Sequence, residues 1–185
     1  MTAISLGPTP ARREVLARRI RLLVAATITY NVIEAVVAIT AGTIASSTAL
    51  IGFGLDSVIE VSSAAAVAWQ FSAREHAVRV AREKITLRII AVSFFALAAY
   101  VSVDAVRALA GPGEADRSVP GIVIAALSLA VMPFLSAAQR RVGRELGSAS
   151  AVADSKQTLL CTYLSAVLLV GLVLNATLGW WWADP

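Results

Sequence analysis

Apolar residues fall in five long stretches, and the short segments between them hold most of the charged residues. Each stretch has about the 20 mostly apolar residues that a helix needs to cross the hydrocarbon core of a bilayer. The approximate limits are residues 20–41, 43–71, 87–110, 120–138 and 151–182. The pattern predicts an all-α fold, a polytopic transmembrane helix bundle of five spans, preceded by a short tail at residues 1–18.

The composition supports a membrane location for these stretches. Hydrophobic residues make up 58% of the chain and charged residues 15%, and the mean hydropathy is +0.76. A soluble domain of 185 residues could not bury so much apolar surface. No linker rich in Pro, Gly or Ser divides the chain, so we expect one transmembrane domain over residues 19–185. Residues 1–18 hold no apolar run, and we expect no cleavable signal peptide there.

The basic residues are distributed unevenly between the two ends of the predicted spans. Arg107 and Arg117 belong to one end, and the other fourteen of the sixteen Lys and Arg residues belong to the opposite end. The positive-inside rule places the richer end in the cytoplasm. We therefore expect a cytoplasmic N-terminal tail, a C-terminus outside the cell, and a multi-pass protein of the inner (plasma) membrane.

Charge and cysteine content exclude several other classes of protein. The sequence pI is near 9.8, but the basic residues flank the spans and form no patch interleaved with exposed aromatic residues, so we expect no nucleic-acid partner. The single Cys and single His exclude an internal disulfide and a Cys/His zinc cluster. The lipid bilayer is the partner that the composition indicates.

Two acidic residues, Asp56 and Glu60, stand one helical turn apart in the middle of the apolar residues 50–61. A carboxylate at the centre of a membrane helix costs roughly 2.5 to 3.5 kcal/mol, so the pair needs a cation, a proton or water as a partner. Side chains four residues apart lie about 5 to 6 Å from each other on one helix face, so both can reach one ion. We interpret the pair as an ion site, since two adjacent carboxylates repel each other in a simple contact between helices.

Three other acidic or amide side chains are accessory candidates. Asn31 and Glu34 lie three residues apart in the first stretch and face either the ion path or a hydroxyl or amide group on a neighbouring helix. Asp154 lies near the start of the last stretch, where the helix dipole favours a negative charge. For Asp154 we expect this dipole interaction, with a role at the ion site as the alternative.

The fifth stretch offers a second pair, Gln157 and Cys161, which are also four residues apart. By themselves, a Gln and a Cys in a membrane helix indicate no more than packing. The fifth span runs antiparallel to the second, however, so its pair can face Asp56 and Glu60 across the bundle.

The residues around both pairs resemble motifs of the cation diffusion facilitator (cation efflux) family. The first motif comprises Ser47-Thr48-Ala49-Leu50, Asp56-Ser57, Glu60 and Ser62-Ser63. The second comprises Ala153-Asp154-Ser155-Lys156-Gln157, Cys161 and Ser165. The first is similar to the family's second helix, which carries His or Asp and then Asp four residues on. The second is similar to its fifth helix, where His and Asp complete a tetrahedral metal site.

The resemblance runs from about residue 20 to the end of the sequence. It implies a homodimer and a site-bearing bundle of the first, second, fourth and fifth helices, with the third beside it. In the second motif Gln157 stands where His is usual, and Cys161 stands where Asp is usual. The family's sixth helix and cytoplasmic C-terminal domain are not in the sequence, so we expect either a truncated chain or a five-helix natural variant.

The donor atoms of the two pairs suit a divalent cation. Asp56, Glu60 and Cys161 can each lose a proton, and Gln157 offers a carbonyl oxygen. Four such ligands suit Zn²⁺; the thiolate also suits Cd²⁺, and the oxygens suit Mn²⁺ or Fe²⁺. Release of the cation would leave clustered negative charges that take up protons. We interpret the protein as a transition-metal efflux transporter with zinc favoured, working by alternating access as a metal/proton antiporter, with no cofactor and no catalysed reaction.

Two other functions remain open at this stage. A non-transporting, metal-sensing membrane subunit would use the same site to regulate a partner. An exporter of small organic cations would pair its substrate with Asp56 and Glu60, and it would need an aromatic cavity that the few central aromatic residues do not readily form.

Overall fold

The computed structural model describes residues 8–110 and 116–180, apart from the side chains of residues 104, 105 and 108–110. The described part contains five α-helices. Their bounds are α1 Pro10–Ala45, α2 Thr48–Ser72, α3 His76–Ala110, α4 Val119–Leu146 and α5 Ala149–Leu178. All five are long and apolar enough to cross a membrane. The predicted all-α transmembrane bundle is confirmed.

Serine side chains and left-handed residues determine where helices begin and end. The hydroxyls of Ser47, Ser118 and Ser148 accept hydrogen bonds from the first turns of α2, α4 and α5, where backbone N–H groups have no partner within the helix. Gly147 adopts φ +70° and ends α4 with a hydrogen bond from its N–H to the carbonyl of Arg144. These caps allow α4 to turn directly into the antiparallel α5.

The first connection lies four residues later than the sequence pattern predicts. We predicted a second span from residue 43, whereas residues 43–45 belong to α1, and the chain turns at Ser46, which has φ 54°. Three hydroxyl residues, Ser46, Ser47 and Thr48, interrupt the apolar run here, but no charged residue does, so hydropathy marks the turn only weakly; the Ser47 cap decides it. The last predicted stretch, to residue 182, runs past the end of α5 at Leu178 and partly outside the described residues.

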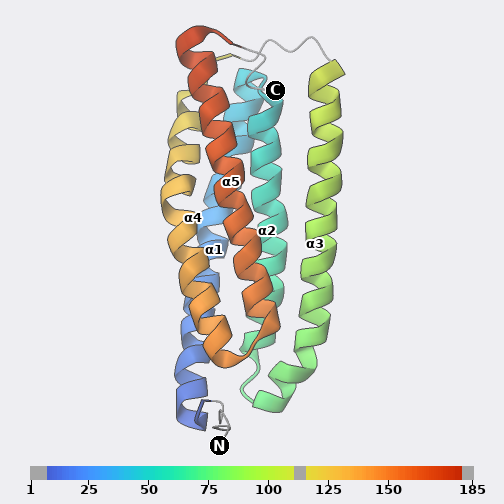
Figure 1. Cartoon of the computed structure of the whole chain (residues 1–185), viewed down its shortest axis with the longest axis vertical. Helices are drawn as coiled ribbons and strands as arrows, with labels where there is room; N and C mark the ends of the chain where they lie inside the picture. Colours follow the sequence, from blue (N-terminus) through green and yellow to red (C-terminus); the bar gives the residue numbers. More distant parts are fainter. Residues whose placement is uncertain (1–7, 111–115, 181–185) are drawn as a thin grey trace, which may run out of the picture.

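Helices α1, α2, α4 and α5 form the bundle, and α3 stands beside it, where it contacts α2 and α5 (Figure 1). This arrangement is the one that the family resemblance implied. Helices α1 and α2 pack closely because small residues face the partner helix: a Cβ added to Gly54 would lie 2.6 Å from Cγ1 of Ile39. A Cβ on Gly42 would lie 2.8 Å from the backbone nitrogen of Ile51.

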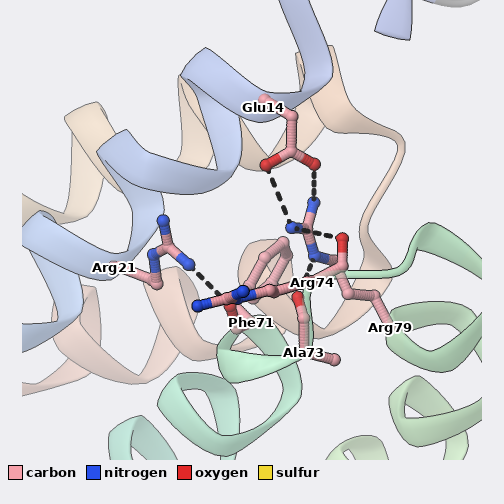
Figure 2. Close-up of polar contacts among 6 residues, drawn as sticks. All are labelled: Glu14, Arg21, Phe71, Ala73, Arg74 and Arg79. Atoms are coloured by element: carbon pink, nitrogen blue, oxygen red, sulfur yellow. Dashed lines mark hydrogen bonds and ion pairs between the residues drawn. The ribbon is translucent and has the colours of Figure 1, made fainter. Parts of the chain in front are cut away.

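The α2–α3 corner is fastened to α1 by Arg79, as Figure 2 shows. Its guanidinium is buried and lies 3.0 Å from Oε1 of Glu14, and it donates to the backbone carbonyls of Ala73 at 2.7 Å and Arg74 at 3.1 Å. The hydrogen bond from Arg79 holds the pKa of Glu14, which precedes the apolar part of α1, below its usual value. We call the end of the bundle with this corner and the α4–α5 connection the basic end.

Candidate functional site

Two apolar clusters fill the bundle at different heights. The cluster near the basic end includes Leu16, Ile20, Val67 and Phe71, and the cluster toward the other end includes Leu50, Phe53, Met132 and Leu172. Between them lies a layer of buried polar side chains from four helices. Its members are Thr27, Asn31, Glu34, Asp56, Ser57, Glu60, Ser63, Ser128, Ser136, Gln139, Asp154, Gln157 and Thr158. We call this set the polar layer.

Asp56 and Glu60 are at the centre of this layer, 2% and 1% exposed. They face inward because they lie four residues apart on the side of α2 that packs against the bundle. No hydrogen bond reaches Oδ2 of Asp56; neither carboxylate oxygen of Glu60 accepts one of good geometry, although the Thr158 side chain of α5 interacts with it. A buried acidic group with unpaired oxygens is costly, so these atoms are available to a ligand.

The α5 pair is equally buried, with Gln157 and Cys161 each 1% exposed. The side-chain amide of Gln157 makes no hydrogen bond through either its oxygen or its nitrogen. The Cys161 sulfur lies 3.8 Å from Oε2 of Glu34 and 3.8 Å from the Ser128 hydroxyl. The structure therefore brings Cys161 toward α1 and α4, while Gln157 keeps its whole hydrogen-bonding capacity unused.

The α1 pair contributes to the same layer, with Asn31 and Glu34 fully buried. Oε2 of Glu34 accepts a hydrogen bond of 2.8 Å from the Ser57 hydroxyl of α2, which is one of the two partners that the sequence left open. Oε1 of Glu34 and both polar atoms of Asn31 have no hydrogen-bond partner. Electrostatic interactions also couple Glu34 to Asp56 and Glu60.

Asp154 departs from our expectation of a carboxylate that interacts with the dipole at the helix start. It is 1% exposed, in the second turn of α5, and accepts hydrogen bonds from the Ser63 hydroxyl at 3.0 Å and from Nε2 of Gln139 at 3.4 Å. Interhelical packing, rather than the dipole, gives this carboxylate its partners. Lys156, two residues on, is exposed.

Sequence reasoning missed Gln139 and the role of the serines. Gln139 directly precedes Arg140 and Arg141, so it reads as part of the basic end, yet it is 1% exposed and donates to Asp154. The sequence singled out Ser63 only as part of the first motif, although its hydroxyl contacts Asp154. Its position three residues after Glu60, on the same helix face, was the available signal.

The polar layer gathers the predicted residues without assembling a compact metal centre. Within residues 8–110 and 116–180, no group of three or more His, Cys, Asp or Glu side chains is close enough to hold a metal ion. Asp56, Glu60 and Asp154 are nevertheless near enough to interact electrostatically. The layer is thus a zone of acidic side chains across the middle of the bundle, several of whose oxygens lack hydrogen-bond partners, and such a zone suits a cation or protons as partners.

The family model described as the cation efflux transmembrane domain matches residues 24–185. The chain belongs to the cation efflux family. This cation efflux protein is accordingly a multi-pass membrane protein that transports cations rather than an enzyme. A search of curated proteins finds no match to the chain.

Proposed function

We propose that this protein exports a divalent transition metal, zinc by preference, in exchange for protons, and that Asp56, Glu60, Gln157 and Cys161 bind the ion. The unpaired donor atoms support the assignment most strongly. In a native structure nearly all buried polar atoms have partners, because each one left without a partner costs about 1 to 3 kcal/mol. Here unpaired atoms belong to three of the four proposed ligands, Asp56, Glu60 and Gln157.

The donor chemistry suits zinc. Carboxylates of Asp56 and Glu60, the amide oxygen of Gln157 and the sulfur of Cys161 give four ligands of mixed hardness, and zinc accepts all three types. Because the ligands come from α2 and α5, a small sliding of these two helices would bring them together around the ion or draw them apart. Glu34 and Asp154 add carboxyl groups around the site and Asn31 adds an amide, all three as accessory residues.

Proton exchange follows from the same charges. Once the metal has left, Asp56, Glu60 and Cys161 cannot all stay negatively charged in a layer with little water, because desolvation and mutual repulsion favour the protonated forms. Metal binding would release those protons and metal release would take them up. The proposal is therefore metal/proton antiport by alternating access.

Orientation and assembly belong to the proposal too. The fourteen basic residues at one end support a cytoplasmic location for that end by the positive-inside rule, so the cation would leave through the opposite end. We propose the inner (plasma) membrane as the location and a homodimer as the assembly, the latter on the family resemblance alone.

Metal flux into proteoliposomes tests the assignment. Asp56→Asn and Glu60→Gln keep the side-chain shape but remove the charge, and each should lower zinc flux by about a hundredfold, as expected when one ligand carries about 2.7 kcal/mol of binding. Glu145→Gln is the matched control, since Glu145 is an exposed carboxylate at the end of α4.

The control should transport like the unaltered protein. Full zinc flux in both Asp56→Asn and Glu60→Gln, with normal insertion, would remove the carboxylate pair from the site. Zinc-driven acidification or alkalinisation of the vesicle interior, followed with a pH-sensitive dye, tests the proton exchange separately. Zinc movement without any pH change would exclude antiport and leave the site intact.

A further inference from the structure

A basic cavity lies between α4 and α5, and of the polar layer only Ser136 lines it. Its volume is about 400 Å³, and it is lined by Pro133, Ser136, Ala137, Arg140, Arg141, Arg144 and Leu159. Six of the seven lining residues come from α4, at spacings of three and four residues, so they form one continuous stripe along that helix. Leu159 of α5 forms the facing wall.

The stripe changes from apolar to cationic along the helix. Pro133, Ala137 and Leu159 provide an apolar wall at the level of the last apolar turns of α4, and three arginines follow within the next two turns. In a membrane this level is the boundary between acyl chains and headgroups. The cavity therefore has one apolar and one cationic part in the order in which a phospholipid presents its acyl chain and its phosphate.

The arginines are free to bind an anion. Arg140 lines the cavity, and its Nε is buried without a hydrogen-bond partner. The nearest acidic residue along α4, Glu145, is already paired with Arg12 at 2.7 Å and interacts with Arg141 only electrostatically. Ser136 lines the cavity too, but its hydroxyl donates to the Ser155 carbonyl at 2.6 Å and is occupied.

We propose that this cavity binds the phosphate of an anionic phospholipid, with one acyl chain lying against Pro133, Ala137 and Leu159. Guanidinium groups bind phosphate oxygens in a bidentate manner, and basic pockets between transmembrane helices are suited to anionic headgroups. The lipid would fill the space between α4 and α5 next to the turn that joins them. It would thereby link the lipid composition of the membrane to the position of α5, which carries Gln157 and Cys161.

Native mass spectrometry of the full chain, released from nanodiscs that contain equal amounts of phosphatidylglycerol and phosphatidylcholine, tests the proposal. We expect phosphatidylglycerol to be retained in preference to phosphatidylcholine. In the double variant R140Q/R144Q the ratio of the two retained lipids should fall by about fivefold for each arginine removed. The matched control R18Q/R88Q removes two exposed arginines that do not line the cavity, and it should retain the lipid.

A second variant tests the shape of the cavity without a change of charge. Ala137→Trp fills the apolar part of the cavity and should displace the lipid while all three arginines remain. Three results would overturn the proposal. The unaltered protein would retain both lipids equally, R140Q/R144Q and A137W would retain phosphatidylglycerol in full, or R18Q/R88Q would lose as much phosphatidylglycerol as R140Q/R144Q. Inorganic phosphate or glycerol 3-phosphate that displaces the lipid at millimolar concentration would identify the site as one for soluble phosphates instead.

Discussion

Two carboxylates of the polar layer, Asp56 and Asp154, are buried to the same degree but have opposite surroundings. Asp154 accepts two hydrogen bonds, from Ser63 and Gln139, whereas Oδ2 of Asp56 accepts none. Burial is costly for both carboxylates, since Asp56 is 2% and Asp154 is 1% exposed. The protein itself offsets that cost for Asp154, and for Asp56 the offset has to come from a cation or a proton.

The difference separates residues that hold the bundle together from residues that hold a ligand. A similar hydrogen-bonded group lies at the basic end, where Oε1 of Glu83 accepts from the Ser148 hydroxyl at 2.8 Å and the backbone of Ser150 at 3.2 Å. The Ser150 hydroxyl in turn donates to Gln70. This group joins α2 and α3 to the start of α5. Side chains with hydrogen-bond partners thus connect the helices. The unpartnered oxygens of residues such as Asp56 lie between these connections and remain for a ligand.

Truncation of the two aspartates should give the largest contrast in stability. Asp154→Ala and Asp56→Ala remove the same atoms from equally buried positions, but only Asp154→Ala also removes hydrogen bonds to a carboxylate. We expect Asp154→Ala to lower the free energy of unfolding in detergent by about 2 kcal/mol more than Asp56→Ala does. Equal losses, or a greater loss for Asp56→Ala, would contradict the division into structural and ligand-binding carboxylates.

A change of the α5 pair should give an intermediate effect on selectivity. Gln157→His together with Cys161→Asp replaces an amide and a soft sulfur with an imidazole and a hard oxygen, which lowers the preference for Cd²⁺ relative to Zn²⁺. We expect the Cd²⁺/Zn²⁺ ratio of initial flux rates to fall by about tenfold, equivalent to about 1.4 kcal/mol. Ser165→Ala, one turn beyond Cys161, is the control. An unaltered ratio would exclude α5 as a source of ligands.

The smallest effect should come from Glu14, a satisfied carboxylate that is 59% exposed in its ion pair with Arg79. Solvent weakens such a pair, so Glu14→Gln should lower the free energy of unfolding at neutral pH by less than about 1 kcal/mol. Because pairing lowers the pKa of Glu14 in the folded protein, its contribution is present above the unfolded pKa and disappears as the pH falls through the folded value.

The unaltered protein and Glu14→Gln should therefore become equally stable once the pH falls below the lowered pKa of Glu14 in the folded protein. Chemical unfolding in the same detergent at pH 7 and at low pH measures this difference. A gap between the two proteins that widens on acidification would show that Glu14 is not held by Arg79 in solution. A cost as large as that of Asp154→Ala would show that burial does not determine the size of these effects.

Local spacing in the sequence determined most of the helices and the position of the two pairs on α2 and α5. Apolar stretches of sufficient length have few alternatives to a membrane helix, and residues four apart share a face in any α-helix. The first connection was predicted four residues too early because the turn at Ser46 carries no charged residue or proline; its position depends on the Ser47 cap.

Only the tertiary structure decided which polar side chains have partners. Helical spacing shows that Asp154 lies one turn from Gln157 and Thr158, but it does not show that Ser63 of α2 and Gln139 of α4 reach its oxygens. Nor could it show that the amide of Gln157 has no partner. Partners across the bundle depend on how each helix is rotated and translated against its neighbours, and close contacts such as Gly54 against Ile39 fix that arrangement only once the helices have packed.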